Sequence, residues 1–90
     1  MKNLTLIIPA KNEKESLPTV LAELKNYDCK IKVILEENDK ETIDAIKLFN
    51  CTLIFQKKNG YGNALIEGIN HTKTEFFCII NADGSMNPNE

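Results

Sequence analysis

The sequence has almost no excess of either charge and no long apolar run, and both absences exclude classes of function. Eleven Lys and Arg residues stand against 13 Asp and Glu residues, and the two signs are scattered along the chain. We therefore expect no nucleic acid and no anionic membrane surface as a partner. The N-terminal apolar stretch, residues 4–8, is too short for a signal peptide or a membrane span.

Cysteine is scarce as well, and the three present, Cys29, Cys51 and Cys78, are odd in number and widely spaced. Each lies beside or within an apolar run, as is typical of reduced thiols in an intracellular protein. We therefore predict a cytoplasmic protein without a disulfide or a cysteine metal site.

Internal repeats, linkers and low-complexity segments are absent, and four short apolar runs organise the chain instead. These runs are residues 4–8, 31–35, 52–55 and 76–80. They are rich in Ile, Val, Leu and Phe, and most do not alternate with polar residues. Such runs are typical of strands that are buried on both faces of a parallel sheet.

The segments between the runs have helical periodicity. Their apolar stripes are Leu17, Val20, Leu21 and Leu24; Thr42, Ala45, Ile46 and Phe49; and Ala64, Leu65, Gly68 and Ile69. Pro18 is tolerated only in a first turn, so the first helix should begin near residues 14–16. Asn38 and Glu41 resemble a capping box for the second helix. Gly68 would allow the third helix to pack closely on the sheet.

The alternation of strands and helices predicts an α/β fold in one small domain, residues 1–90. Right-handed helical crossovers would give an open, mainly parallel four-stranded sheet with helices on both faces. We expect the strand order 3-2-1-4, which is the common doubly wound pattern.

Polar or Gly-rich segments follow all four predicted strands. They are residues 9–13, 36–38, 57–63 and 81–85, and the amino ends of the strands carry nothing comparable. In such a sheet, ligands bind outside the carboxyl ends of the strands, above all where the strand order reverses. The sequence therefore predicts a site at this edge, centred between the first and fourth strands.

Two of these segments have specific ligand chemistry, each beside a simpler interpretation. Asp83 and Asn81 offer hard oxygen ligands that suit Mg²⁺ or Mn²⁺, but Asn-Ala-Asp-Gly is also a good turn sequence. Residues 60–62, Gly-Tyr-Gly, precede a helix whose amides favour phosphate, with Lys57 and Lys58 nearby. Gly-rich turns are nevertheless common between a strand and a helix.

The acidic positions also have two interpretations. Glu36 and Glu37 would accept hydrogen bonds from a base or ribose, or would simply be solvated. Asn12 and Glu13 would belong to the site, or would help to start the first helix. His71 is expected on the surface near a helix end.

Other nucleotide-binding folds fit less well. A dinucleotide-binding domain carries Gly-x-Gly-x-x-Gly after its first strand, whereas the glycines here follow the third strand and Leu65 replaces the last of them. A Walker A sequence is absent. A sugar nucleotidyltransferase would have a Gly-rich loop where residues 9–12 read Pro-Ala-Lys-Asn.

Taken together, these segments resemble family-2 glycosyltransferases with the GT-A fold. Residues 6–18 are similar to that family's first strand and its Pro-x-x-Asn-Glu signature, and residues 60–68 to its Gly-x-Gly-x-Ala-x-x-x-Gly region. Residues 76–88 look like the strand that ends in the Asp-x-Asp metal motif. The most similar subgroup is the dolichyl- or polyprenyl-phosphate mannose or glucose synthases. The resemblance covers nearly the whole chain.

The resemblance implies roles for individual positions. Those implied to bind a nucleotide-diphosphate sugar are Pro9, Ala10, Asn12, Glu13, Glu36, Gly60, Gly62, Asn81 and Ala82. Asp83 would hold Mg²⁺ or Mn²⁺, and Ser85 would be a further metal ligand. The implied reaction is an inverting hexosyl transfer from a UDP- or GDP-linked sugar to an acceptor such as a polyprenyl phosphate, at the cytoplasmic face of a membrane.

The chain departs from the family pattern at three places. After the second strand, residues 36–42 have glutamates for aspartates, no glycine and one residue fewer, and Asn81 replaces an aspartate. The later half of the GT-A fold is absent, so we expect a truncated domain whose open sheet edge invites self-association. The alternative is a non-catalytic or degenerate fragment that only binds nucleotide or serves as an association module.

Overall fold

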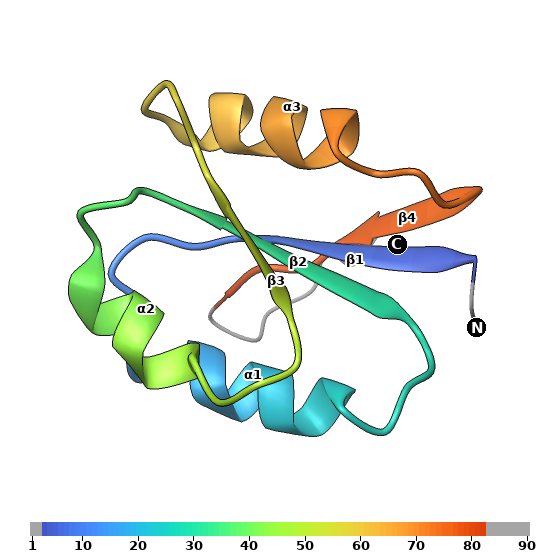
Figure 1. Ribbon diagram of the computed structural model, residues 1–90, viewed down its shortest axis with the longest axis horizontal. Coiled ribbons are helices and arrows are strands. Elements are labelled where there is room, and N and C mark those ends of the chain that lie inside the picture. The colour runs from blue at the N-terminus through green and yellow to red at the C-terminus, as the bar shows by residue number, and fades with distance from the viewer. Residues whose placement is uncertain (1–2, 83–90) are drawn as a thin grey trace.

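The computed structural model describes residues 3–82, in which four strands alternate with three helices (Figure 1). The strands are β1 (Leu4–Pro9), β2 (Lys30–Leu35), β3 (Thr52–Phe55) and β4 (Phe76–Ile79). The helices are α1 (Leu17–Leu24), α2 (Lys40–Ile46) and α3 (Tyr61–Asn70). Each predicted strand agrees with the observed one to within a residue at either end.

The strands form one sheet in the order β3-β2-β1-β4, and all three neighbouring pairs are parallel. The predicted order and the α/β class are confirmed. The central strand β1 pairs with β2 through register partners such as Ile8 and Val33, and with β4 through partners such as Leu6 and Cys78.

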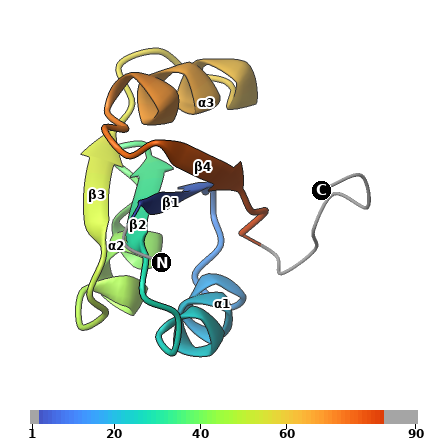
Figure 2. The same cartoon turned by 90° about the vertical axis from the view of Figure 1, so that its right-hand side faces the viewer.

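Helices cover both faces of the sheet, which is why the strand sequences do not alternate. Helices α1 and α2 lie on one face and α3 on the other (Figures 1 and 2). The larger core, between the sheet and α1 and α2, is built on residues such as Leu6, Ile8, Leu21 and Leu35. The smaller core, under α3, comprises Ile7, Ile34, Ile54 and Ala64.

The starts of α1 and α2 can be compared with the sequence-based predictions. Helix α1 begins at Leu17, one residue after the predicted range of 14–16, and has a proline in its first turn, as predicted. The prediction of a capping box at the start of α2 is wrong, because the N-cap is Asp39 and its side chain makes no capping hydrogen bond. Asn38 instead lies within a turn closed by the Asp39 amide, which donates to the Glu36 carbonyl at 3.1 Å.

The predicted close packing of α3 at Gly68 is confirmed. A Cβ atom at this position would lie 2.6 Å from Ile7 Cγ2 and 2.9 Å from Ile34 Cδ1, both below any ordinary contact distance. The hydrogen atom of glycine therefore sets the distance between α3 and the centre of the sheet. Within residues 3–82, no helix is both long and apolar enough to cross a membrane.

Candidate functional site

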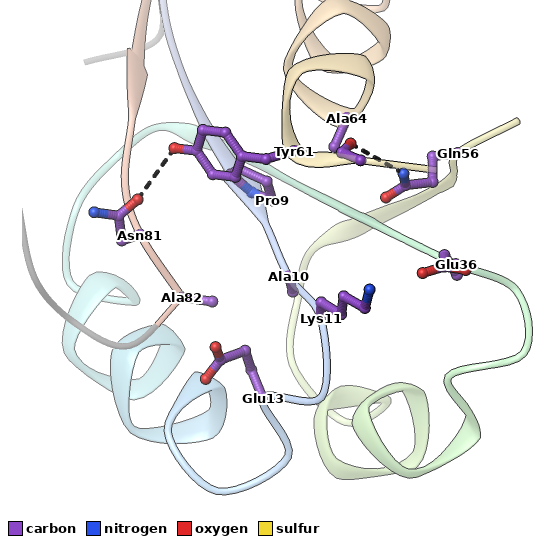
Figure 3. A pocket seen from close by; sticks show the side chains of 11 residues that line it. Pro9, Ala10, Lys11, Glu13, Glu36, Gln56, Tyr61, Ala64, Asn81 and Ala82 are labelled. Atoms are coloured by element: carbon purple, nitrogen blue, oxygen red, sulfur yellow. Dashed lines mark hydrogen bonds between the residues drawn. The ribbon is translucent and has the colours of Figure 1, made fainter. Parts of the chain in front are cut away.

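A cavity of about 280 Å³ lies at the carboxyl edge of the sheet, and we call it the edge cavity (Figure 3). The chain contributes to it from the ends of all four strands and from the start of α3. Its lining residues are Pro9, Ala10, Lys11, Glu13, Glu36, Gln56, Gly60, Tyr61, Ala64, Asn81 and Ala82. The cavity occupies the edge at which the sequence places the site.

The sheet itself holds the walls of this cavity. Backbone hydrogen bonds continue the parallel ladders one residue past the strands: the Ala10 amide donates to the Ile34 carbonyl at 2.8 Å. The Gln56 amide donates to the Leu35 carbonyl at 2.9 Å, and the Ile80 amide donates to the Ile7 carbonyl at 3.0 Å. The segments that follow the strands are therefore fixed relative to one another.

Seven of the nine positions implied for nucleotide-sugar binding line the edge cavity. They are Pro9, Ala10, Glu13, Glu36, Gly60, Asn81 and Ala82. The other two do not line it. Gly62 is exposed in the first turn of α3, and Asn12 lines a different hollow.

That second hollow, which we call the adjoining groove, is polar and about 490 Å³ in volume. Its lining residues are Lys11, Asn12, Glu36, Asn38, Asp39, Lys40 and Glu41. Lys11 and Glu36 line both hollows, so the two lie side by side. Asn12, which lines this groove, has a left-handed backbone with φ of 55°, a conformation that asparagine tolerates better than most residues.

Four further lining residues were not among the positions implied to bind the nucleotide sugar: Lys11, Gln56, Tyr61 and Ala64. Gln56 is the first residue after β3, and its place at a strand end was the signal that could have found it. Its side-chain amide donates to the Lys58 carbonyl at 2.7 Å and so shapes the loop before α3. The Tyr61 hydroxyl donates to Asn81 Oδ1 at 3.2 Å and joins α3 to the end of β4 (Figure 3).

The lysines that the sequence placed near the phosphate site lie elsewhere. Lys57 and Lys58 are exposed and line a separate hollow beside α3, together with residues such as Glu67 and His71. The cause is a hydrogen bond of 2.7 Å from the Lys57 amide to Glu67 Oε1, which holds this loop against the helix. His71 is exposed at the end of α3, as expected.

The charges that line the edge cavity favour neither a bare anion nor a bare cation strongly. Two carboxylates, Glu13 and Glu36, face one ammonium group, Lys11. Glu13 Oε2 accepts a hydrogen bond of 2.6 Å from the Ser16 hydroxyl, which orients this carboxylate. The cavity therefore combines hydrogen-bond acceptors with one positive charge.

The family model described as "Glycosyl transferase family 2" matches residues 5–90. The chain belongs to glycosyltransferase family 2. Its four-stranded parallel sheet is consistent with the N-terminal half of a GT-A domain.

Three proteins named as uncharacterized glycosyltransferases are similar to this family 2 chain, one from Mycobacterium bovis and one from each of two Mycobacterium tuberculosis strains. Each is 30% identical over 82 residues, which is 91% of this chain and 37% of the relative. The chain thus spans little more than a third of the length of these relatives. No solved structure matches it.

Family 2 glycosyltransferases commonly use divalent cations, so the oxygen donors near the cavity matter. Asn81 supplies an amide oxygen at the end of β4. The other expected ligands, Asp83 and Ser85, lie outside the described residues. Within residues 3–82, no group of three or more His, Cys, Asp or Glu side chains is placed to hold a metal.

Proposed function

We propose that this family 2 chain binds the nucleotide diphosphate of a UDP- or GDP-linked sugar at the edge cavity, together with Mg²⁺ or Mn²⁺. The observation that carries the proposal is the convergence of residues from all four strand ends on one cavity. In open α/β sheets, ligands bind at this edge and at the point where the strand order reverses. That point lies here between β1 and β4.

The balance of charge supports a requirement for the cation. Among the described side chains that line the edge cavity, Glu13 and Glu36 are negative and Lys11 is positive, so these charges would give a diphosphate little net attraction. Asn81, Asp83 and Ser85 would offer the cation an amide, a carboxylate and a hydroxyl oxygen, which are donors suited to Mg²⁺ or Mn²⁺. When bound, the cation would offset negative charge on the departing diphosphate.

Glu36 is the residue that we propose contacts the base or ribose. It is partly buried and lines both the edge cavity and the adjoining groove, so a ligand that extends from one to the other would lie beside it. Its carboxylate can accept hydrogen bonds from base amino groups or from ribose hydroxyls. Its neighbour Glu37 is exposed and lines neither hollow.

This pair of neighbouring glutamates provides the test. Calorimetric titration of UDP and GDP with Mn²⁺ should show binding to the wild type for at least one nucleotide. Glu36→Ala should weaken that binding by about tenfold or more, because a hydrogen bond to a charged group contributes about 1.5–3 kcal/mol. Glu37→Ala, which removes the same charge from the same loop, should bind as the wild type does.

Binding without Mn²⁺ dependence would refute the cation, and equal losses in the two variants would refute the role of Glu36. An absence of binding to either nucleotide would favour the alternative of a non-catalytic association module.

The acceptor and the cellular location extend the same proposal. We propose a polyprenyl phosphate as acceptor, because its phosphate is already ionised and needs no general base to attack the sugar. We propose a cytoplasmic location at the membrane face, which the three free thiols suit. Self-association would use β4, a sheet edge on which Phe76 and Phe77 are 57% and 46% exposed.

A further inference from the structure

The loop after β1 is fastened to the start of α2 by hydrogen bonds that the sequence does not reveal. The Asn12 amide donates to Asp39 Oδ2 at 2.8 Å, and the Glu13 amide donates to Thr42 Oγ1 at 3.1 Å. Both donors are backbone groups of the loop, and both acceptors are side chains of α2 or its N-cap. We call these two bonds the loop clamp.

The loop clamp explains two features that are otherwise costly. Asp39 is the N-cap of α2 but makes no capping bond with its side chain, because the carboxylate reaches Asn12 instead. Asn12 holds a left-handed backbone, with φ of 55°, which must be stabilised by its surroundings. The bond to Asp39 fixes the peptide on the amino side of this strained residue.

Thr42 is the buried part of the loop clamp. Its side chain is fully buried, so the surrounding residues hold its hydroxyl in place. A buried hydroxyl that accepts one backbone amide fixes that amide in place. The Leu17 amide donates to the Glu13 carbonyl at 3.0 Å, so Glu13 is also bonded to the first residue of α1.

A third contact joins the same two segments but carries less weight. Lys14 Nζ donates to Glu41 Oε2 at 2.6 Å, and the hydrogen bond raises the pKa of Lys14. The two side chains are 52% and 75% exposed, however, and ion pairs this exposed contribute little. This pair therefore serves as a control rather than as part of the loop clamp.

The residues held by the loop clamp lie between the two hollows of the candidate site. Lys11 lines both, Asn12 lines the adjoining groove, and Glu13 lines the edge cavity. We propose that Asp39 and Thr42 are positioning residues, which act on nucleotide binding by fixing the loop of residues 11–13. This inference rests on the proposed function of the edge cavity.

Paired substitutions in the full chain test this role. Thr42→Val keeps the shape of the side chain but removes the acceptor, whereas Thr42→Ser restores it. Asp39→Ala and Asp39→Asn form the same contrast at the more exposed bond. Loss of one bond should weaken UDP or GDP binding in the presence of Mn²⁺ by about three- to tenfold. The serine and asparagine variants should recover most of that loss.

Amide hydrogen exchange gives a second readout that needs no nucleotide. Thr42→Val should speed exchange of the Glu13 amide by about three- to tenfold, and Thr42→Ser should not. Lys14→Ala should change neither exchange nor affinity. If Thr42→Val fails to fold, the Asp39 pair still tests the role through exchange of the Asn12 amide, which a direct contact between Asp39 and nucleotide would not change.

The possible failures are distinct. If Thr42→Val and Asp39→Ala bind nucleotide as tightly as the wild type does, the positioning role alone is overturned. A wild type with a protected Glu13 amide but no nucleotide binding would overturn the proposed function, and the positioning role with it.

Discussion

Residues of the same type differ in whether they line the candidate site, and the difference follows their position relative to a strand end. Glu36, one residue past β2, lines both hollows of the candidate site, whereas Glu37 is exposed and lines neither. Lys11, two residues past β1, likewise lines both, whereas Lys57 is held beside α3. Position at the sheet edge, rather than residue type, selects the groups that a ligand would meet.

Cys51 gives a prediction at this scale. Burial raises the pKa of its thiol above the ordinary value of 9.0, so less thiolate is present at a given pH. Iodoacetamide at pH 8 should therefore alkylate Cys51 more slowly in the folded chain than in urea, as followed by mass spectrometry. Equal rates in the two states would contradict the assigned burial.

The raised pKa of Cys51 also determines the direction in which pH changes the free energy of unfolding. The folded state holds the Cys51 proton more tightly than the unfolded chain does, so the associated stability is fully present below pH 9.0. It is lost as the pH rises through the higher, folded value. Cys51→Ala should remove this part of the loss of stability at alkaline pH.

Among the helices, α3 shows how closely an element can be tied to the sheet. Its buried positions in the described chain are Ala64 and Gly68, the two smallest residue types, and they face the side chains of β1 and β2. Small residues bring the helix near to the strands. Its N-terminus at Gly60 and Tyr61 therefore reaches the edge cavity.

Two glycines of α3 give matched substitutions. Gly68→Ala should lower the free energy of unfolding by about 1–3 kcal/mol, because the new Cβ would meet the fully buried Ile7 and Ile34 side chains. That loss exceeds the gain in helix propensity of up to about 1 kcal/mol. Gly62→Ala has open space and should be neutral or stabilising. Urea denaturation measures both, and two variants of equal stability would contradict this packing.

The elements were largely predictable from the sequence, but the contacts between them were not. Doubly buried strands and helical stripes are local patterns, so the runs at residues 4–8 and 31–35 revealed β1 and β2. The start of α2 was mispredicted because Asp39 serves a residue 27 positions away instead of its own helix. No local pattern reports such a bond.

For the whole molecule, the strand order brings together segments from positions 9 to 82 at one edge. The doubly wound pattern predicted this edge, and hence most of the lining residues. It did not predict that Asn12 turns toward the adjoining groove, because a left-handed backbone depends on tertiary support. The candidate site was thus predictable in location and only partly in the direction of its side chains.

Amide chemical-shift mapping shows whether the edge cavity receives a nucleotide diphosphate. On adding UDP or GDP with Mg²⁺, the largest shifts should occur at amides around the edge cavity, such as Ala10, Glu36, Tyr61 and Asn81. Amides at the opposite edge, such as Cys29 and Asn50, should not move. Shifts centred on that opposite edge, or none with either nucleotide, would show that the edge cavity does not bind a nucleotide diphosphate.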